Sequence, residues 1–135
     1  MNTALYGPIL SLMLLTMTVW FWMYIKRISY MKQNDIDPQR LVSRVRLMQV
    51  LPDEIQAPAN NLNNLFELPL LFYALYLLNS QQASIGPILT NLAWAYVFLR
   101  VIHCSYNKVL HRFTAYSLSC LVLWAMLMLT IFRFV

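Results

Sequence analysis

The sequence predicts an all-α integral membrane protein in which four transmembrane helices form one bundle. The chain is 60% hydrophobic and only 11% charged, whereas soluble domains have about 25% charged residues. Three long stretches, at 1–25, 68–99 and 113–132, contain no Asp, Glu, Lys or Arg. Because about 20 apolar residues are enough for a helix to cross a bilayer, each stretch is long enough for at least one span.

The four spans are expected at residues 6–26, 62–79, 87–107 and 113–134, and together they form a single domain over residues 1–135. The middle uncharged stretch contributes two of them, because its polar segment NSQQASIGP contains the Gly and Pro typical of a turn. The first span is expected to be retained rather than cleaved as a signal peptide, since it lacks an early basic residue and ends in bulky aromatic side chains.

Basic residues predict the orientation of the spans. Six of the ten Lys and Arg residues lie between the first two spans, two flank the third connection, and the second connection has none. The positive-inside rule then places the first and third connections in the cytoplasm and both termini outside. The net charge of +5 is explained by this topology, and the sequence lacks the aromatic-interleaved basic patch of a nucleic-acid-binding protein.

The first connection contains a segment with helical periodicity, NDIDPQRLVSRVRLMQVLP. Asp37 followed by Pro38 is a favourable helix start, because Asp caps free N–H groups and Pro suits the first turn. Leu41, Val45 and Met48 then recur at helical spacing. We expect a short amphipathic helix at the inner membrane interface, which either grips anionic lipid or contributes to a substrate site.

Ionisable residues inside the second and third spans form the first part of a candidate site. Such residues are costly in a membrane and usually face protein or a water-filled cavity. Glu67 shares a helix face with Asn64, and Arg100 shares one with His103. Glu67 and Arg100 each lie about 10 Å from the inner end of their span at 1.5 Å per residue. We therefore expect Glu67 and Arg100 to form an ion pair at one depth in the membrane. This pair either stabilises the packing of the two helices or is part of a binding site.

The fourth span adds Arg112 at the cytoplasmic boundary and Tyr116 one turn further on. Taken alone, Arg112 is equally explained as an anchor for lipid phosphate, and a packing role explains His103 better than a role as a ligand or base does. Cys104 and Cys120 lack metal-ligand spacing, so no metal site is expected. The sequence also lacks a Gly-rich phosphate loop. The convergence of these polar groups on the inner half of the bundle favours a binding site.

Three motifs resemble the MAPEG family, the membrane-associated proteins in eicosanoid and glutathione metabolism. They are NLFELP in the second span, RVIHCSYN at the end of the third, and HRFTAYSL at the start of the fourth. The order and spacing of these motifs match those of the family over essentially the whole chain. The similarity is greatest to short bacterial members, which implies a multi-pass protein of the bacterial inner membrane with periplasmic termini.

The resemblance implies a homotrimer of four-helix protomers that holds glutathione between neighbouring subunits, in the cytoplasmic half of the membrane. Membrane lipids and a lipophilic small molecule are the other implied partners. Carried over by position, the ligand-binding residues are Asn64, Glu67, Arg100 and His103, and the catalytic residues at the thiol of glutathione are Arg112 and Tyr116.

The sequence is compatible with three functions. The first is a glutathione-dependent transferase or peroxidase that acts on a lipophilic electrophile from the bilayer. The second is a non-catalytic ligand-binding or scaffold protein on the same fold, since glutathione-using relatives tend to carry arginine where this chain has Asn60 and Asn63. The third is a proton-coupled exporter, which is disfavoured because Glu67 has Arg100 at a matching depth.

Overall fold

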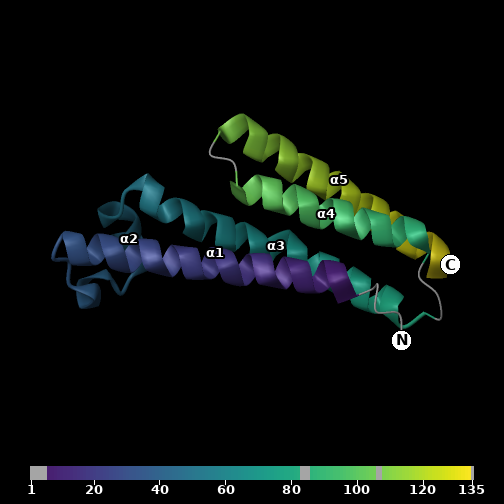
Figure 1. The fold of residues 1–135 in the computed structure, drawn as a ribbon, viewed down its shortest axis with the longest axis horizontal. Helices are drawn as coiled ribbons and strands as arrows, with labels where there is room; N and C mark the ends of the chain where they lie inside the picture. The colour runs from purple at the N-terminus through teal and green to yellow at the C-terminus, as the bar shows by residue number, and fades with distance from the viewer. Residues whose placement is uncertain (1–5, 83–85, 106–107, 135) are drawn as a thin grey trace. The chain divides into compact units, whose positions relative to one another are not determined.

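The computed structural model describes residues 6–82, 86–105 and 108–134, and all regular secondary structure in this part of the chain is helical. Long helices alternate with short connections, apart from a longer segment between the first two long helices that contains two short helices (Figure 1). The elements are α1 (Tyr6–Gln33), the 3-10 helix η2 (Pro38–Leu41), α2 (Arg44–Val50), α3 (Asp53–Ser80), α4 (Pro87–Ser105) and α5 (Val109–Phe134).

The helices belong to two compact units, and α1 and α3 each contribute to both. The first unit consists of Met1–Leu15 and Phe66–Val135, and the second of Thr16–Leu65. The first unit therefore contains α4, α5 and the adjoining parts of α1 and α3. The second contains the remaining parts of α1 and α3 together with η2 and α2.

In the first unit, α4 and α5 pack against each other as an antiparallel pair (Figure 1). A buried polar contact joins α3 to α5, because the Asn79 amide donates a hydrogen bond to Thr130 Oγ1 at 2.9 Å. The same amide also donates to the carbonyl of Leu75 at 2.7 Å. A hydrogen bond between buried polar groups holds helices at a fixed register, since breaking it leaves an unsatisfied group in an apolar interior.

The first-unit part of α1 contacts α4 closely at Gly7. A Cβ added at Gly7 lies 2.8 Å from Cζ2 of Trp94, whereas one added at Gly86 meets nothing within 4 Å. These two glycines occupy matching places in the similar segments YGPILS and IGPILT. The similarity of the segments therefore does not extend to packing.

Replacing Gly7 by alanine is expected to lower the free energy of unfolding by about 1 kcal/mol, because the rigid indole of Trp94 has to move. Gly86→Ala is the matched control and should change it by less than about 0.5 kcal/mol. Thermal unfolding of the two variants in detergent measures the difference, and equal effects would contradict the close α1–α4 contact.

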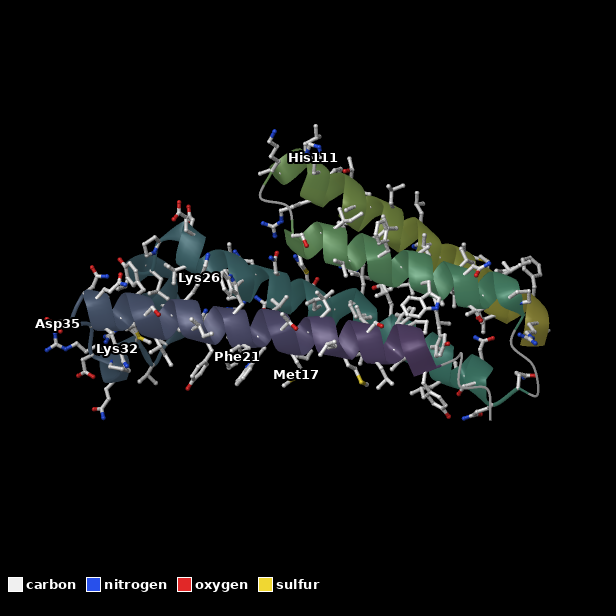
Figure 2. All side chains as sticks on the ribbon, viewed as in Figure 1. Met17, Phe21, Lys26, Lys32, Asp35 and His111 are labelled. Carbon is white, nitrogen blue, oxygen red and sulfur yellow. The ribbon has the colours of Figure 1, made fainter. Side chains whose placement is uncertain are left out.

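In the second unit, α1 ends at a left-handed turn. Asp35 has φ 49°, and the N–H of Ile36 donates to the carbonyl of Met31 at 3.0 Å. This bond closes the last turn of the helix, as expected for a helix end with a left-handed residue. Figure 2 shows Asp35 just beyond the end of α1, and Met17 and Phe21 projecting from one side of the same helix, where both are exposed.

The segment after α1 is helical as predicted, but it forms two short helices rather than a single one. Asp37 caps η2 by accepting a hydrogen bond from Gln39 N at 3.0 Å, which confirms the predicted helix start. The chain then leaves the helical conformation, and Ser43 caps α2 through a bond from Arg46 N to its hydroxyl at 3.2 Å. A second cap therefore divides the segment into two short helices. Leu41 is buried, whereas Val45 is 65% exposed.

The helices extend beyond the predicted spans. α1 continues past residue 26 to Gln33, α3 begins at Asp53 rather than 62, and α5 begins at Val109 rather than 113. Span boundaries follow the apolar composition, but a helix continues into water where polar side chains permit it. The predicted end of the third span at residue 107 lies outside the described residues.

Within the described residues, three helices are long and apolar enough to cross a membrane. They are α1, α4 and α5, while α3 is not among them although it is 28 residues long. The polar residues of the predicted second span, including Asn60, Asn64 and Glu67, lie in α3. A count of four spanning helices therefore stays a prediction.

Candidate functional site

A column of stacked side chains runs through the first unit from α3 to α5. The rings of Phe72 and Tyr76 are stacked on α3, with centroids 5.9 Å apart. Phe72 also stacks on Tyr96 of α4 at 4.7 Å, with an angle of 12° between the ring planes. Arg100 comes next, since its Cζ lies 5.2 Å from the centre of the Tyr96 ring and 5.0 Å from that of Tyr116 on α5. Both distances suit cation–π attraction.

Arg100 is the most unusual member of this column. Its side chain is 0% exposed, and none of its three guanidinium nitrogens has a hydrogen-bond partner among the described residues. Burial of a charge without a paired anion is costly, and cation–π contacts offset only part of that cost. Arg100 therefore concentrates uncompensated positive charge directly behind the Tyr116 ring.

The predicted ion pair between Glu67 and Arg100 does not form within this chain. Glu67 is exposed on α3, and the Arg100 nitrogens form no hydrogen bond to its carboxylate. Residues at equal depth on two helices meet only if the rotation of each helix about its own axis turns them toward each other, and equal depth does not determine that rotation. The guanidinium instead lies close to the rings of Tyr96 and Tyr116.

His103 joins the end of α4 to the first turn of α5. The side chain is 5% exposed, and its Nδ1 donates a hydrogen bond to the Arg112 carbonyl at 2.9 Å. A carbonyl oxygen only accepts, so Nδ1 carries the proton in this contact. The imidazole also lies 5.7 Å from the Tyr116 ring, centre to centre. His103 thus fixes the position of the α5 N-terminus relative to Arg100.

Arg112 and Tyr116 lie one turn apart near the start of α5, and both are half-buried. The N–H of Arg112 donates to the carbonyl of Lys108 at 3.1 Å, so Arg112 belongs to the first turn of the helix. Free N–H groups and the helix dipole make such a turn favourable for an anion. The sequence-predicted residues His103, Arg100 and Tyr116 are therefore brought together with the backbone of Arg112.

Of the two α3 residues of the predicted site, Glu67 interacts electrostatically with Tyr116 of the cluster, whereas Asn64 belongs to the second unit. Glu67 is exposed, as described above, and Asn64 is half-buried in the second unit. Sequence reasoning missed Tyr96 and Phe72, which complete the column around the guanidinium. The spacing of Tyr96 four residues before Arg100 is a signal that was available, because side chains at i and i+4 share a helix face.

An apolar cavity of about 480 Å³ lies between α3 and α5 in the first unit. Cys120 is one of its lining residues and follows Tyr116 by one helical turn. A cavity of this size and apolar lining is typical of small-molecule sites. The remaining lining residues are Leu68, Leu71, Ala74, Leu75 and Leu78 of α3, with Leu123, Trp124 and Leu127 of α5.

Comparison with protein families matches residues 5–132 to the MAPEG family, which covers nearly the whole chain. The chain belongs to the MAPEG family. This is a family of membrane proteins, in agreement with the three helices that are apolar and long enough to span a bilayer. No curated protein and no solved structure matched the chain.

The MAPEG family includes glutathione-dependent transferases and peroxidases as well as non-catalytic members. The motifs from which the resemblance was drawn all lie within the matched residues. Two of those motifs supply Arg100, His103 and Tyr116 of the cluster. The family assignment and the cluster in the first unit thus rest on the same segments of the chain.

Proposed function

We propose that this protein is a glutathione-dependent transferase or peroxidase that acts on lipophilic electrophiles at the inner face of the membrane. The observation that carries the proposal is the buried, unpaired guanidinium of Arg100 behind the ring of Tyr116. Positive charge in a medium less polar than water attracts an anion strongly. The thiolate of glutathione is an anion of the kind that such a site stabilises.

Arg112 and Tyr116 are the proposed contacts of the sulfur. A guanidinium, a tyrosine hydroxyl and the free N–H groups at the start of α5 all favour the thiolate over the neutral thiol. Arg100 adds its charge from behind the Tyr116 ring rather than through direct contact, since all three of its nitrogens are buried. His103 is a positioning residue, because it bonds to the backbone of Arg112.

The electrophile is proposed to enter the apolar cavity between α3 and α5. That cavity is lined by Cys120, one turn beyond Tyr116, so its ligand and the bound thiolate are within reach of each other along α5. In the transferase reaction the thiolate sulfur forms a bond to the electrophilic carbon. The displaced electron pair leaves with the departing group, or remains on the substrate and takes up a proton.

The assembled state is proposed to be a homotrimer of four-span protomers in a bacterial inner membrane, with both termini periplasmic. Glu67 is exposed on α3 in the single chain, and a carboxylate at that depth in hydrocarbon needs cover. A neighbouring subunit together with bound glutathione supplies such cover, and Asn64 and Glu67 then bind the peptide part of glutathione.

A second candidate function is non-catalytic binding of a lipophilic ligand on the same fold. It is favoured by Asn60 and Asn63, which stand where glutathione-using relatives tend to carry arginine. An asparagine amide does not replace a bidentate guanidinium contact to a carboxylate. In this alternative the apolar cavity holds the lipophilic ligand, and the cluster around Arg100 does not bind a thiolate.

Calorimetric titration of the detergent-purified protein with glutathione and with S-hexylglutathione tests the proposal. Saturable heat with both compounds is expected for the transferase, because the S-alkyl chain enters the apolar cavity. Absence of heat with both would contradict the enzyme and favour the lipophilic-ligand alternative.

A further inference from the structure

The first unit contains a smaller pocket at the end of its helices opposite to Arg112. Its volume is about 130 Å³. It is formed where α3 and α5 end and α4 begins, and the C-terminal end of α5 lies beside the start of α4 (Figure 1). We refer to it as the Asn79 pocket. Its lining among the described residues consists of Asn79 of α3, Gly86 just before α4, Ile88 and Leu89 of α4, and Leu129 and Arg133 of α5.

The buried side chain of Asn79 has one unsatisfied atom. The side chain is 1% exposed, and its Nδ2 donates to the carbonyl of Leu75 at 2.7 Å and to Thr130 Oγ1 at 2.9 Å. The Thr130 hydroxyl donates its own hydrogen to the Met126 carbonyl at 2.8 Å, so Oγ1 accepts from the amide and the orientation of the amide is fixed. Asn79 Oδ1 is buried and has no hydrogen-bond partner among the described residues.

This orientation determines which kind of group would complete the site. Both hydrogens of the Asn79 amide are in use, so the atom that lacks a partner is an acceptor. A buried acceptor without a donor is costly, and a bilayer offers little water to supply one. A ligand that satisfies Oδ1 therefore has to carry an N–H or O–H group.

The Asn79 pocket also has a cationic wall. Arg133 lines it and is exposed, and this arginine is the only Asp, Glu, Lys or Arg in residues 113–135. The planar guanidinium has several N–H donors that match the geometry of phosphate, so it can bind a phosphate in addition to its other contacts. The pocket thus combines a group that binds anions with an acceptor that needs a donor.

The position of the pocket along the helices corresponds to the level of lipid headgroups. Asn79 and Arg133 each lie one residue before the end of their helix. The chain that follows α3 continues with the exposed polar residues Gln81 and Gln82. Apolar helix therefore gives way to polar chain at the pocket, as expected where the hydrocarbon core of a bilayer ends.

The size and walls of the pocket indicate that only the head of a ligand enters it. Sites that enclose whole drug-sized molecules have volumes of about 300–1,000 Å³, and this pocket is smaller. A Cβ added at Gly86 meets nothing within 4 Å, so the wall is open at this residue. Ile88 and Leu129 are 65% and 41% exposed, and they offer an apolar surface to the tails of the same ligand.

We propose that the Asn79 pocket binds the headgroup of a phospholipid that carries a hydrogen-bond donor beyond its phosphate, as the ammonium of phosphatidylethanolamine does. The phosphate binds Arg133, the ammonium donates to Asn79 Oδ1, and the acyl chains lie along Ile88 and Leu129. The site is at the opposite end of α5 from Arg112, so the proposal does not depend on glutathione binding.

Native mass spectrometry of the detergent-purified full chain tests this proposal, with phosphatidylethanolamine and phosphatidylcholine of identical acyl chains as probes. The two lipids differ only in the ammonium, whose N–H groups are methylated in phosphatidylcholine. The wild type should prefer phosphatidylethanolamine by about tenfold, the effect of one hydrogen bond from a charged donor. Asn79→Leu should abolish this preference. Thr130→Val is the matched control, because it removes one bond to the Asn79 amide but leaves Oδ1, and it should keep most of the preference.

The role of Arg133 is measured by the total retention of lipid. Arg133→Gln should lower the retention of both lipids by about tenfold and leave their ratio unchanged, because both carry the same phosphate. Arg133→Lys keeps the charge and should lower retention less. Lys108→Gln removes an exposed cation just before α5, at its opposite end, and should change retention by less than about twofold.

Four outcomes would overturn the assignment. Equal retention of the two lipids by the wild type would mean that Oδ1 does not select the headgroup. Equal loss of the preference in Thr130→Val and Asn79→Leu would mean that the helix contact, rather than Oδ1, controls it. Equal effects of Lys108→Gln and Arg133→Gln would mean that net charge controls retention. Displacement of the lipid by soluble phosphoethanolamine would mean that the acyl chains are not part of the ligand.

Discussion

Replacing Arg112 by alanine is expected to abolish the ultraviolet thiolate absorbance that appears when glutathione is added at neutral pH. A free thiol has a pKa near 8.5, and lowering it by about 1.5 units requires roughly 2 kcal/mol of stabilisation of the anion. Arg112 is half-buried in the first turn of α5, where the helix N-terminus adds to its effect. Its removal therefore eliminates one of the cations proposed to stabilise the thiolate.

Two matched variants define the specificity of this effect. Tyr116→Phe removes one hydroxyl and keeps the ring that covers Arg100, so the absorbance should fall less than in Arg112→Ala. Lys108→Ala removes an exposed cation one turn before Arg112 and should leave the signal unchanged. An equal loss in Lys108→Ala would mean that net charge, rather than the position of Arg112, controls the signal.

Replacing Arg100 by methionine is expected to maintain or raise the thermal stability of the protein while weakening glutathione binding by at least about tenfold. The guanidinium is fully buried and has no hydrogen-bond partner among the described residues. Substitution of a buried ion by an apolar side chain of similar volume is often neutral or stabilising by about 1–4 kcal/mol. If the methionine variant is more stable but binds glutathione more weakly, Arg100 serves glutathione binding rather than stability.

Glu67→Gln is the companion variant in this experiment. Because Glu67 forms no hydrogen bond to Arg100 within the chain, its replacement should change the free energy of unfolding by less than about 0.5 kcal/mol. The effects of the two substitutions on stability should add. A loss of about 3–5 kcal/mol in each single variant, with recovery in the double variant, would show instead that a partner subunit supplies the ion pair.

The membrane character and the approximate positions of the long helices could be predicted from the sequence, because both depend on hydrophobic composition over about 20 residues. Helix ends depend on local contacts instead. The division of the loop segment by Ser43 and the left-handed turn at Asp35 each depend on one residue and its backbone conformation. The helical spacing of Leu41, Val45 and Met48 does not predict that Ser43 divides the segment into two helices.

The sequence predicts most residues of the candidate site, but it does not predict all of the contacts between them. Spacing along α4 placed Arg100 and His103 on one face, and the structure brings both next to Tyr116. The residues that surround a guanidinium depend on the rotation of each helix about its axis. The spacing of residues within a single helix does not determine that rotation. For that reason Tyr96 was missed and Glu67 was placed against Arg100.

The most direct test of the glutathione-dependent function is the ultraviolet difference spectrum of the wild-type protein in detergent, recorded as glutathione is added at neutral pH. The proposed site predicts a saturable thiolate band whose half-saturation agrees with the calorimetric affinity for glutathione. Saturable binding of glutathione with no thiolate band would contradict the proposed chemistry, because the cluster around Arg100 and Arg112 would then leave the thiol protonated.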